Sequence, residues 1–198
     1  MKKTFRFVLC TLIAVCMAVS FTACGDDNDD PKDPSEPGVV DELGELKSVE
    51  ATFTLSLTGD YDQLFSTKTV SYTDFDGAVK TEKMTGNTIT ITRKLDNITK
   101  QTNAKLSFDL LLQDNDNAGE TKTYNFGHKV TLKVVANYEK KSGVVKFDNI
   151  ATAKLNTMDY DLVAGDNELR EVLRQGLEAE IGAVVSVDGG TIEASTLN

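Results

Sequence analysis

The chain has 198 residues, of which 31 are acidic and 21 basic, with three cysteines, one histidine and no tryptophan. Its formal net charge of −10 disfavours binding to nucleic acid or to an anionic membrane surface. One histidine excludes a metal centre built from several histidines, and the sequence contains no phosphate-binding loop, Gly-x-Ser-x-Gly elbow or His-Glu-x-x-His motif.

The first 23 residues have the layout of a secretory signal. Three basic residues precede an apolar run from Phe7 to Val19, and residues 20–23 lead up to Cys24. The apolar run is shorter than the roughly 18 to 20 residues that a membrane-spanning helix needs. We therefore expect residues 1–23 to be a cleaved signal peptide.

The residues that end this segment resemble the lipobox of bacterial lipoproteins. They read Phe-Thr-Ala-Cys, with Phe21 where that family usually has leucine. The resemblance implies that Cys24 is acylated, becomes the first mature residue and anchors the protein in a membrane. The acidic tract that follows is similar to the tract after the lipidated cysteine in surface-exposed lipoproteins of Gram-negative anaerobes. The acids of this tract are Asp26, Asp27, Asp29 and Asp30. The similarity implies that the protein is displayed on the outer membrane, facing the medium. An ordinary secretory signal is the alternative.

Removal of the signal changes both the cysteine count and the charge. Cys10 and Cys16 leave with it and a lipid would block Cys24, so no cysteine remains for a disulfide, a nucleophile or a zinc site. The mature chain then has 18 basic and 31 acidic residues and a net charge of −13. We read the acids near its start as solvating a linker rather than as a binding site.

Residues 24–44 are predicted to be a lipidated tether, because acidic and proline-containing sequence cannot bury enough apolar surface to order itself. Residues 45–198 remain, roughly 150 residues, which is enough for one hydrophobic core. The sequence has no sign of a second domain boundary or an internal repeat. We expect 45–198 to form a single β-rich domain.

Alternation of apolar and polar residues is the main pattern of that domain. From Val49 to Leu57 every second residue is apolar, as in a half-buried antiparallel strand. Turn-forming glycine, asparagine and aspartate lie between such segments and predict hairpins, and so a meander closed as a sandwich or as a barrel. The other predicted strands are 88–92, 104–112 and 130–136, with weaker candidates at 68–73, 79–84, 144–148, 150–156, 183–187 and 191–194.

One segment has helical periodicity instead. Apolar residues recur three or four apart between Asp166 and Ile181, which predicts a helix whose apolar stripe faces the core. The order of strands, helix and further strand resembles that of lipocalin-like barrels, although no lipocalin motif is present. The predicted fold class is therefore all-β, mainly an antiparallel meander forming a sandwich or lipocalin-like barrel, with one C-terminal helix.

Motifs that carry chemistry are scarce. Residues 114–119 begin like a calcium loop, which makes Asp114 and Asp116 a weak calcium candidate. Ala118 then occupies a ligand position and Asn125 stands where a bidentate glutamate belongs, so a polar hairpin loop is the favoured interpretation. The sequence predicts no other metal site and no cofactor.

The sequence has two pairs of aspartates, Asp60 with Asp62 and Asp74 with Asp76, that could serve a glycosidase. That reaction depends on the distance between two carboxyl groups across a cleft, which i,i+2 spacing does not determine. We therefore interpret both pairs as turn residues. His128 is interpreted as a strand-edge or turn histidine, and no catalytic residue is assigned. Tyrosines are the available aromatic platforms for a sugar, but Tyr72 and Tyr124 lie in or beside candidate strands and are expected to be packing residues.

These observations lead to one expected function and several rivals. We expect a non-enzymatic binding or accessory lipoprotein of the cell surface, associated with a nutrient-uptake system, whose ligand-binding residues are unknown. The rivals are a barrel that carries a small hydrophobic ligand, a structural or adhesive surface subunit, and a hydrolase. The expected partners are the membrane, through Cys24, and a glycan, a small hydrophobic ligand or an outer-membrane protein, but no nucleic acid.

Overall fold

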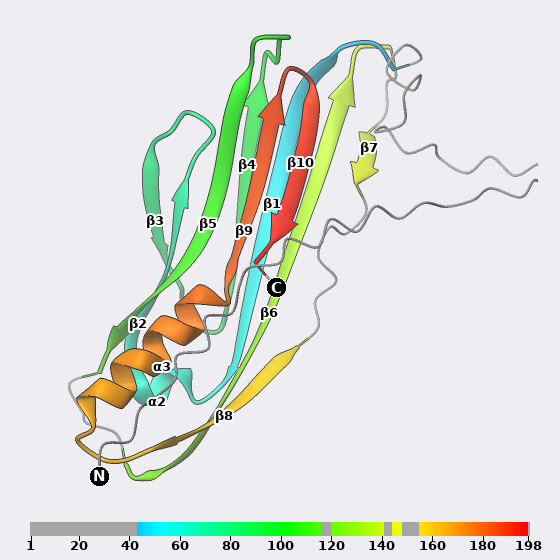
Figure 1. Ribbon diagram of the computed structural model, residues 1–198. Coiled ribbons are helices and arrows are strands. Elements are labelled where there is room, and N and C mark those ends of the chain that lie inside the picture. Colours follow the sequence, from blue (N-terminus) through cyan, green and yellow to red (C-terminus); the bar gives the residue numbers. More distant parts are fainter. Residues whose placement is uncertain (1–42, 116–119, 141–143, 148–154, 198) are drawn as a thin grey trace, which may run out of the picture. The chain divides into compact units, whose positions relative to one another are not determined.

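The computed structural model describes residues 43–115, 120–140, 144–147 and 155–197, which form two antiparallel five-stranded sheets and two helices (Figure 1). Sheet A contains β1 (Leu46–Gly59), β4 (Thr88–Asp96), β6 (Lys122–Tyr138), β7 (Val144–Phe147) and β8 (Asn156–Leu162). Sheet B contains β2 (Phe65–Thr73), β3 (Val79–Lys83), β5 (Asn103–Asp114), β9 (Gly182–Asp188) and β10 (Thr191–Thr196). The helices are α2 (Tyr61–Leu64) and α3 (Asn167–Ala179). The prediction of a mostly antiparallel all-β domain is confirmed.

The strand order differs from the predicted meander. Sheet A has the order β4-β1-β6-β7, with β8 also pairing with β6, and sheet B has the order β10-β9-β5-β2-β3. Consecutive described strands pair in only three cases, β2 with β3, β6 with β7 and β9 with β10. The meander prediction is wrong because β1 ends at Gly59 and the chain passes through α2 into the other sheet. Alternation shows which face of a strand is buried, but it does not show which strand lies beside it.

β1 is the central strand of sheet A and shows why the alternating pattern is so regular. Val49, Phe53 and Leu55 have no exposed surface, and the strand pairs with β4 on one side and β6 on the other. Its second set of side chains, which includes Thr52 and Thr54, is only partly buried and faces outward. The sheet therefore has one core face and one polar face.

The core faces of the two sheets share one hydrophobic cluster. Phe53 of β1 stacks on Phe108 of β5 with ring centroids 4.6 Å apart and planes 7° from parallel, and Tyr72 of β2 contacts Phe108 at 5.7 Å. Near α2, Phe126 of β6 contacts four further aromatic rings at centroid distances of 5.1 to 6.5 Å, those of Tyr61, Phe65, Tyr124 and Tyr160. Aromatic packing thus fills the space between the sheets at two places.

Helix α3 lies within the range 166–181 that the periodicity predicted. The Asp166 carboxylate caps it by accepting a hydrogen bond from the Leu169 amide at 2.9 Å, and Leu173 and Leu177 are buried in the core. Two strands, β9 and β10, follow the helix, so it is an internal element and not the C-terminal one.

Gly59 allows β1 and β6 to approach closely where β1 ends. Its φ of +89° lies in the left-handed region, and a Cβ atom there would stand 2.1 Å from the Asn125 carbonyl oxygen. The next residue, Asp60, then bonds to Asn125 through its own amide, at 2.8 Å. Glycine at this position lets the chain leave sheet A without a clash.

Candidate functional site

The structure places few of the residues that the sequence singled out for function. Cys24, the four acids of the export tract and Asp116 lie outside the described residues. Asp114 ends β5, where its Oδ2 lies 3.9 Å from Nη2 of Arg170 on α3. Within the described ranges no group of three or more histidine, cysteine, aspartate or glutamate residues is arranged to hold a metal ion.

Three of the four paired aspartates form structural contacts. Asp60 accepts a hydrogen bond from the Asn125 amide at 2.8 Å, and Asp76 accepts one from the Ala78 amide at 2.9 Å. Asp62 forms an ion pair with Lys68, a lysine whose side chain is only 7% exposed. The interpretation as turn residues holds for Asp76, whereas Asp62 lies within helix α2 and Asp60, which precedes that helix, bonds to β6.

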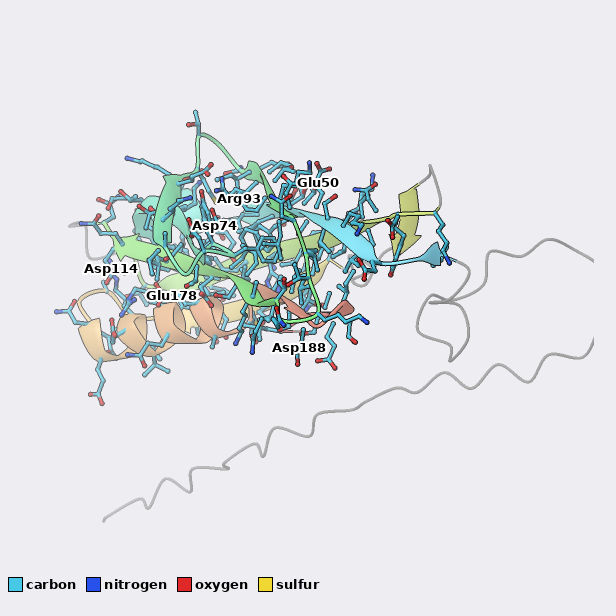
Figure 2. The ribbon with its side chains drawn as sticks, turned by 90° about the horizontal axis from the view of Figure 1, so that it is seen from above. Glu50, Asp74, Arg93, Asp114, Glu178 and Asp188 are labelled. Atoms are coloured by element: carbon cyan, nitrogen blue, oxygen red, sulfur yellow. The ribbon has the colours of Figure 1, made fainter. Side chains whose placement is uncertain are left out.

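The fourth aspartate, Asp74, is at the centre of a cluster of charges. It is buried in the turn between β2 and β3, and its Oδ1 accepts a hydrogen bond from the Phe75 amide at 2.9 Å. Its Oδ2 pairs with Lys80 Nζ at 2.6 Å and with the Arg93 guanidinium. Figure 2 shows Asp74 and Arg93 lying together. Because Lys80 belongs to β3 and Arg93 to β4, the cluster connects the two sheets.

The electrostatics of this cluster favour a structural role. Burial by itself raises the pKa of Asp74, but hydrogen bonds from Arg93 and Lys80 outweigh that effect and lower the pKa to about 2. The hydrogen bond to Asp74 raises the pKa of Arg93, and burial raises that of Tyr72, whose hydroxyl donates to Glu82 at 3.0 Å. A general acid or base needs a pKa near the working pH, and Asp74 remains ionised far below it.

The sequence reasoning missed this cluster, although one signal was available. Arg93 follows Ile89 and Ile91 at the same alternate positions of β4, so it occupies an inward-facing site in a strand that otherwise turns apolar residues inward. Its cross-strand partner on β1, Ala51, is fully buried. A charged side chain at such a position requires a partner of opposite charge.

The outer face of sheet A carries a regular set of hydroxyl groups. Thr52 of β1 lies 3.1 Å from Thr92 of β4, measured between their Oγ1 atoms, and Thr54 lies 3.1 Å from Thr90 in the next row. In the third row Thr88 Oγ1 donates a hydrogen bond to Ser56 Oγ at 3.2 Å. The hydroxyls of Thr52, Thr54 and Ser56 are therefore each paired with a hydroxyl of β4, in three successive rows.

Strand β6 extends these rows on the other side of β1. Lys133, Thr131 and Lys129 lie opposite Thr52, Thr54 and Ser56 in the register. We call the three rows the threonine–lysine face, which consists of Thr52, Thr54, Ser56, Thr88, Thr90, Thr92, Lys129, Thr131 and Lys133. Glu50, labelled in Figure 2, lies with Lys94 and Val135 in the row beyond its end.

The aromatic residues and the histidine lie inside the protein. Tyr61, Tyr72 and Tyr124 are at most 3% exposed, and Tyr138 and Tyr160 pack against the core. The prediction that Tyr72 and Tyr124 are packing residues is confirmed. His128 is fully buried within β6, between β1 and β8, so its expected place at a strand edge or turn is wrong.

No protein-family model matches this chain, and no curated protein or solved structure matches it either. Among the described residues, no helix has the length and apolar character that spanning a membrane requires.

Proposed function

We propose that the protein is a non-enzymatic binding module of the cell surface, anchored in the outer membrane by a lipidated Cys24 and accessory to nutrient uptake. The observation that carries this proposal is the order of features at the start of the chain: a basic segment, an apolar run, Phe-Thr-Ala-Cys and an acidic tract. Residues 24–44 are the tether, and the two sheets are the binding body.

We further infer that the two sheets form a sandwich and not a barrel. No described strand of sheet A pairs with a strand of sheet B. The Phe53–Phe108 stack lies where a barrel that carries a hydrophobic ligand needs an open cavity. Both observations favour a packed interior, so the binding surface is on the outside of the domain.

The structural or adhesive subunit is the second candidate. Among the described strands β4 pairs only with β1, and its first five residues, Thr88–Thr92, are uncharged. An unprotected edge of this kind can accept a strand from another chain. In that case unboiled SDS extracts of the cell envelope contain a ladder of polymers, and Thr90→Pro abolishes it.

The anchoring proposal is tested with labelled palmitate and protease. Cells that produce the protein are expected to incorporate the label into it, whereas cells that produce Cys24→Ala are not. Protease added to intact cells is expected to remove the lipidated protein, because the tether presents the domain to the medium. An unlabelled wild-type protein, or one that protease reaches only after lysis, contradicts the proposal.

A further inference from the structure

We propose that the threonine–lysine face binds an acidic polysaccharide. This inference rests on the proposed function, because it identifies the ligand class of the surface-displayed binding module. Three observations carry it: the hydroxyl groups are ordered, the two lysines lack acidic partners, and the face presents no large apolar side chain.

The hydroxyl groups are ordered before any ligand arrives. A threonine side chain has restricted χ1 freedom, and the cross-strand contacts of 3.1 to 3.2 Å fix the hydroxyls of three rows further. Each such pair uses one hydroxyl hydrogen and leaves a second donor and several lone pairs available. A polymer that carries many hydroxyl groups can therefore bond to this face at a low cost in conformational entropy.

The charge of the face is opposite to that of the chain. Lys129 and Lys133 are both exposed, and neither forms an ion pair with any described residue. No acid lies in the three rows, although the whole chain has a net charge of −10. Two lysines four residues apart on one strand are about 13 Å from each other, so a single extended anionic chain can reach both.

The same features disfavour other polyanions. Stable attachment to an anionic membrane takes clusters of about four to eight basic residues, each worth about 1 kcal/mol, and this face has two. Single-stranded nucleic acid requires aromatic rings for stacking, and all five tyrosines are packed in or against the core. A protein partner would require a buried apolar anchor, which the threonine and lysine side chains of these rows do not supply.

The test compares two polymers of the same sugar backbone, one neutral and one in which sulfate esters replace part of the hydroxyl groups. Binding of dextran sulfate and of unmodified dextran to the protein purified from its producing cells is measured by affinity electrophoresis, together with binding of polygalacturonate. We expect the two acidic polymers to bind and dextran not to bind. Binding is expected to weaken as salt rises, because exposed charges are screened.

Matched variants locate the binding surface. Lys129→Ala with Lys133→Ala is expected to weaken binding about tenfold, and Thr54→Val with Thr90→Val, which removes one ordered pair of hydroxyls, about threefold. The control is Lys83→Ala with Lys105→Ala, which removes the same charge from exposed positions of β3 and β5 in sheet B. It is expected to change binding less than about twofold.

Each remaining outcome overturns the inference. If dextran binds as well as dextran sulfate, charge is not what the protein recognises. If the two lysine variants have equal effects, the ligand binds elsewhere on the protein. If phosphatidylglycerol vesicles bind and the polymers do not, the ligand of the face is a membrane. If neither acidic polymer binds while palmitate labelling and protease removal succeed, the anchored surface location stands and this ligand assignment falls.

Discussion

Asp74 receives hydrogen bonds from a backbone amide and from cationic side chains of both sheets. Arg93 and Lys80 point inward from β4 and β3, which are the terminal strands on one side of sheets A and B. Inward-pointing charges on terminal strands discourage pairing with other chains, and here both cations pair with one buried carboxylate. The same contacts therefore hold the sheets together and protect part of their edges.

The low pKa of Asp74 predicts a pH-dependent stability. A carboxyl group whose pKa falls from 3.8 to about 2 on folding stabilises the native state fully above pH 3.8, and this stabilisation disappears as the pH falls through 2. We expect Asp74→Asn to lower the free energy of unfolding by about 2 kcal/mol at pH 7 and to have little effect near pH 2. Urea denaturation of both proteins at the two pH values measures this difference.

Asp76→Asn is the matched control for this prediction. Asp76 lies in the same turn, but it is exposed, and its one side-chain bond within the described part of the chain is to the Ala78 amide. Its replacement should leave the pH dependence of unfolding like that of the wild type. If Asp74→Asn lowers the free energy of unfolding as much at pH 2 as at pH 7, the ion pairs of Asp74 are not the cause of the loss.

At the scale of elements, helix α3 takes the place of a strand. The pairing of β9 with β5 ends where Gly182 lies opposite Asp109. Beyond that point the Leu110 amide donates to the Ile181 carbonyl at 3.4 Å, and the Leu112 amide donates to the Glu178 carboxylate at 2.7 Å. Figure 2 shows Glu178 and Asp114 on the side of the domain where α3 lies. The helix thus satisfies and covers an edge that β9 leaves unpaired.

This arrangement predicts that Glu178 stabilises the end of β5. Glu178→Ala leaves the Leu112 amide without its partner, and we expect a loss of about 1 to 2 kcal/mol in the free energy of unfolding, with faster hydrogen exchange at Leu112. Glu171→Ala is the control, because Glu171 also pairs with Arg174 but accepts no bond from β5. It should have a smaller effect on stability and none on Leu112. Equal exchange at Leu112 in the two variants contradicts the role assigned to Glu178.

The sequence predicted individual elements better than their connections. Strands with strict alternation, such as β1 and β5, and the periodic helix α3 were all found from their patterns. β8 also alternates, with Met158, Tyr160 and Leu162 at every second position, but the prediction ended at residue 156. The four-residue helix α2 has no periodicity to detect. Pairing of β1 with β4 and β6 depends on long-range packing, which a local pattern does not contain.

The sequence predicted strands of the threonine–lysine face, but it did not predict that they lie side by side. The sequence predicts both strands, and it has threonine or serine at alternate positions of 52–58 and threonine at alternate positions of 88–92. That the two strands are neighbours, with Thr54 opposite Thr90, follows only from the register. The same holds for the Asp74 cluster, because its partners are 6 and 19 residues away along the chain. Sites assembled across strands require the topology before they can be seen.

At the scale of the whole described domain, the packing between the sheets determines where a ligand can bind. Phe53 and Phe108 have at most 1% exposed surface and stack directly across the interior. A carrier of hydrophobic ligands keeps a cavity at this place, whereas a packed core excludes such ligands. A packed interior therefore predicts that ligands bind only to the outer faces, whereas a cavity between the sheets predicts binding of a hydrophobic ligand inside.

We predict that the wild-type protein shows no saturable binding of an apolar fluorescent probe such as a labelled fatty acid. Phe108→Ala is the positive control, because removal of the buried ring leaves an apolar cavity that a small ligand such as benzene can enter. That variant should lose about 3 to 5 kcal/mol of stability and regain part of it when benzene is added, as a rise in its melting temperature. If Phe108→Ala does not fold, Leu106→Ala, at the neighbouring core position of β5, replaces it. Saturable fatty-acid binding by the wild-type protein would mean that the sheets enclose a cavity, and the ligand site would then move from the outer face to the interior.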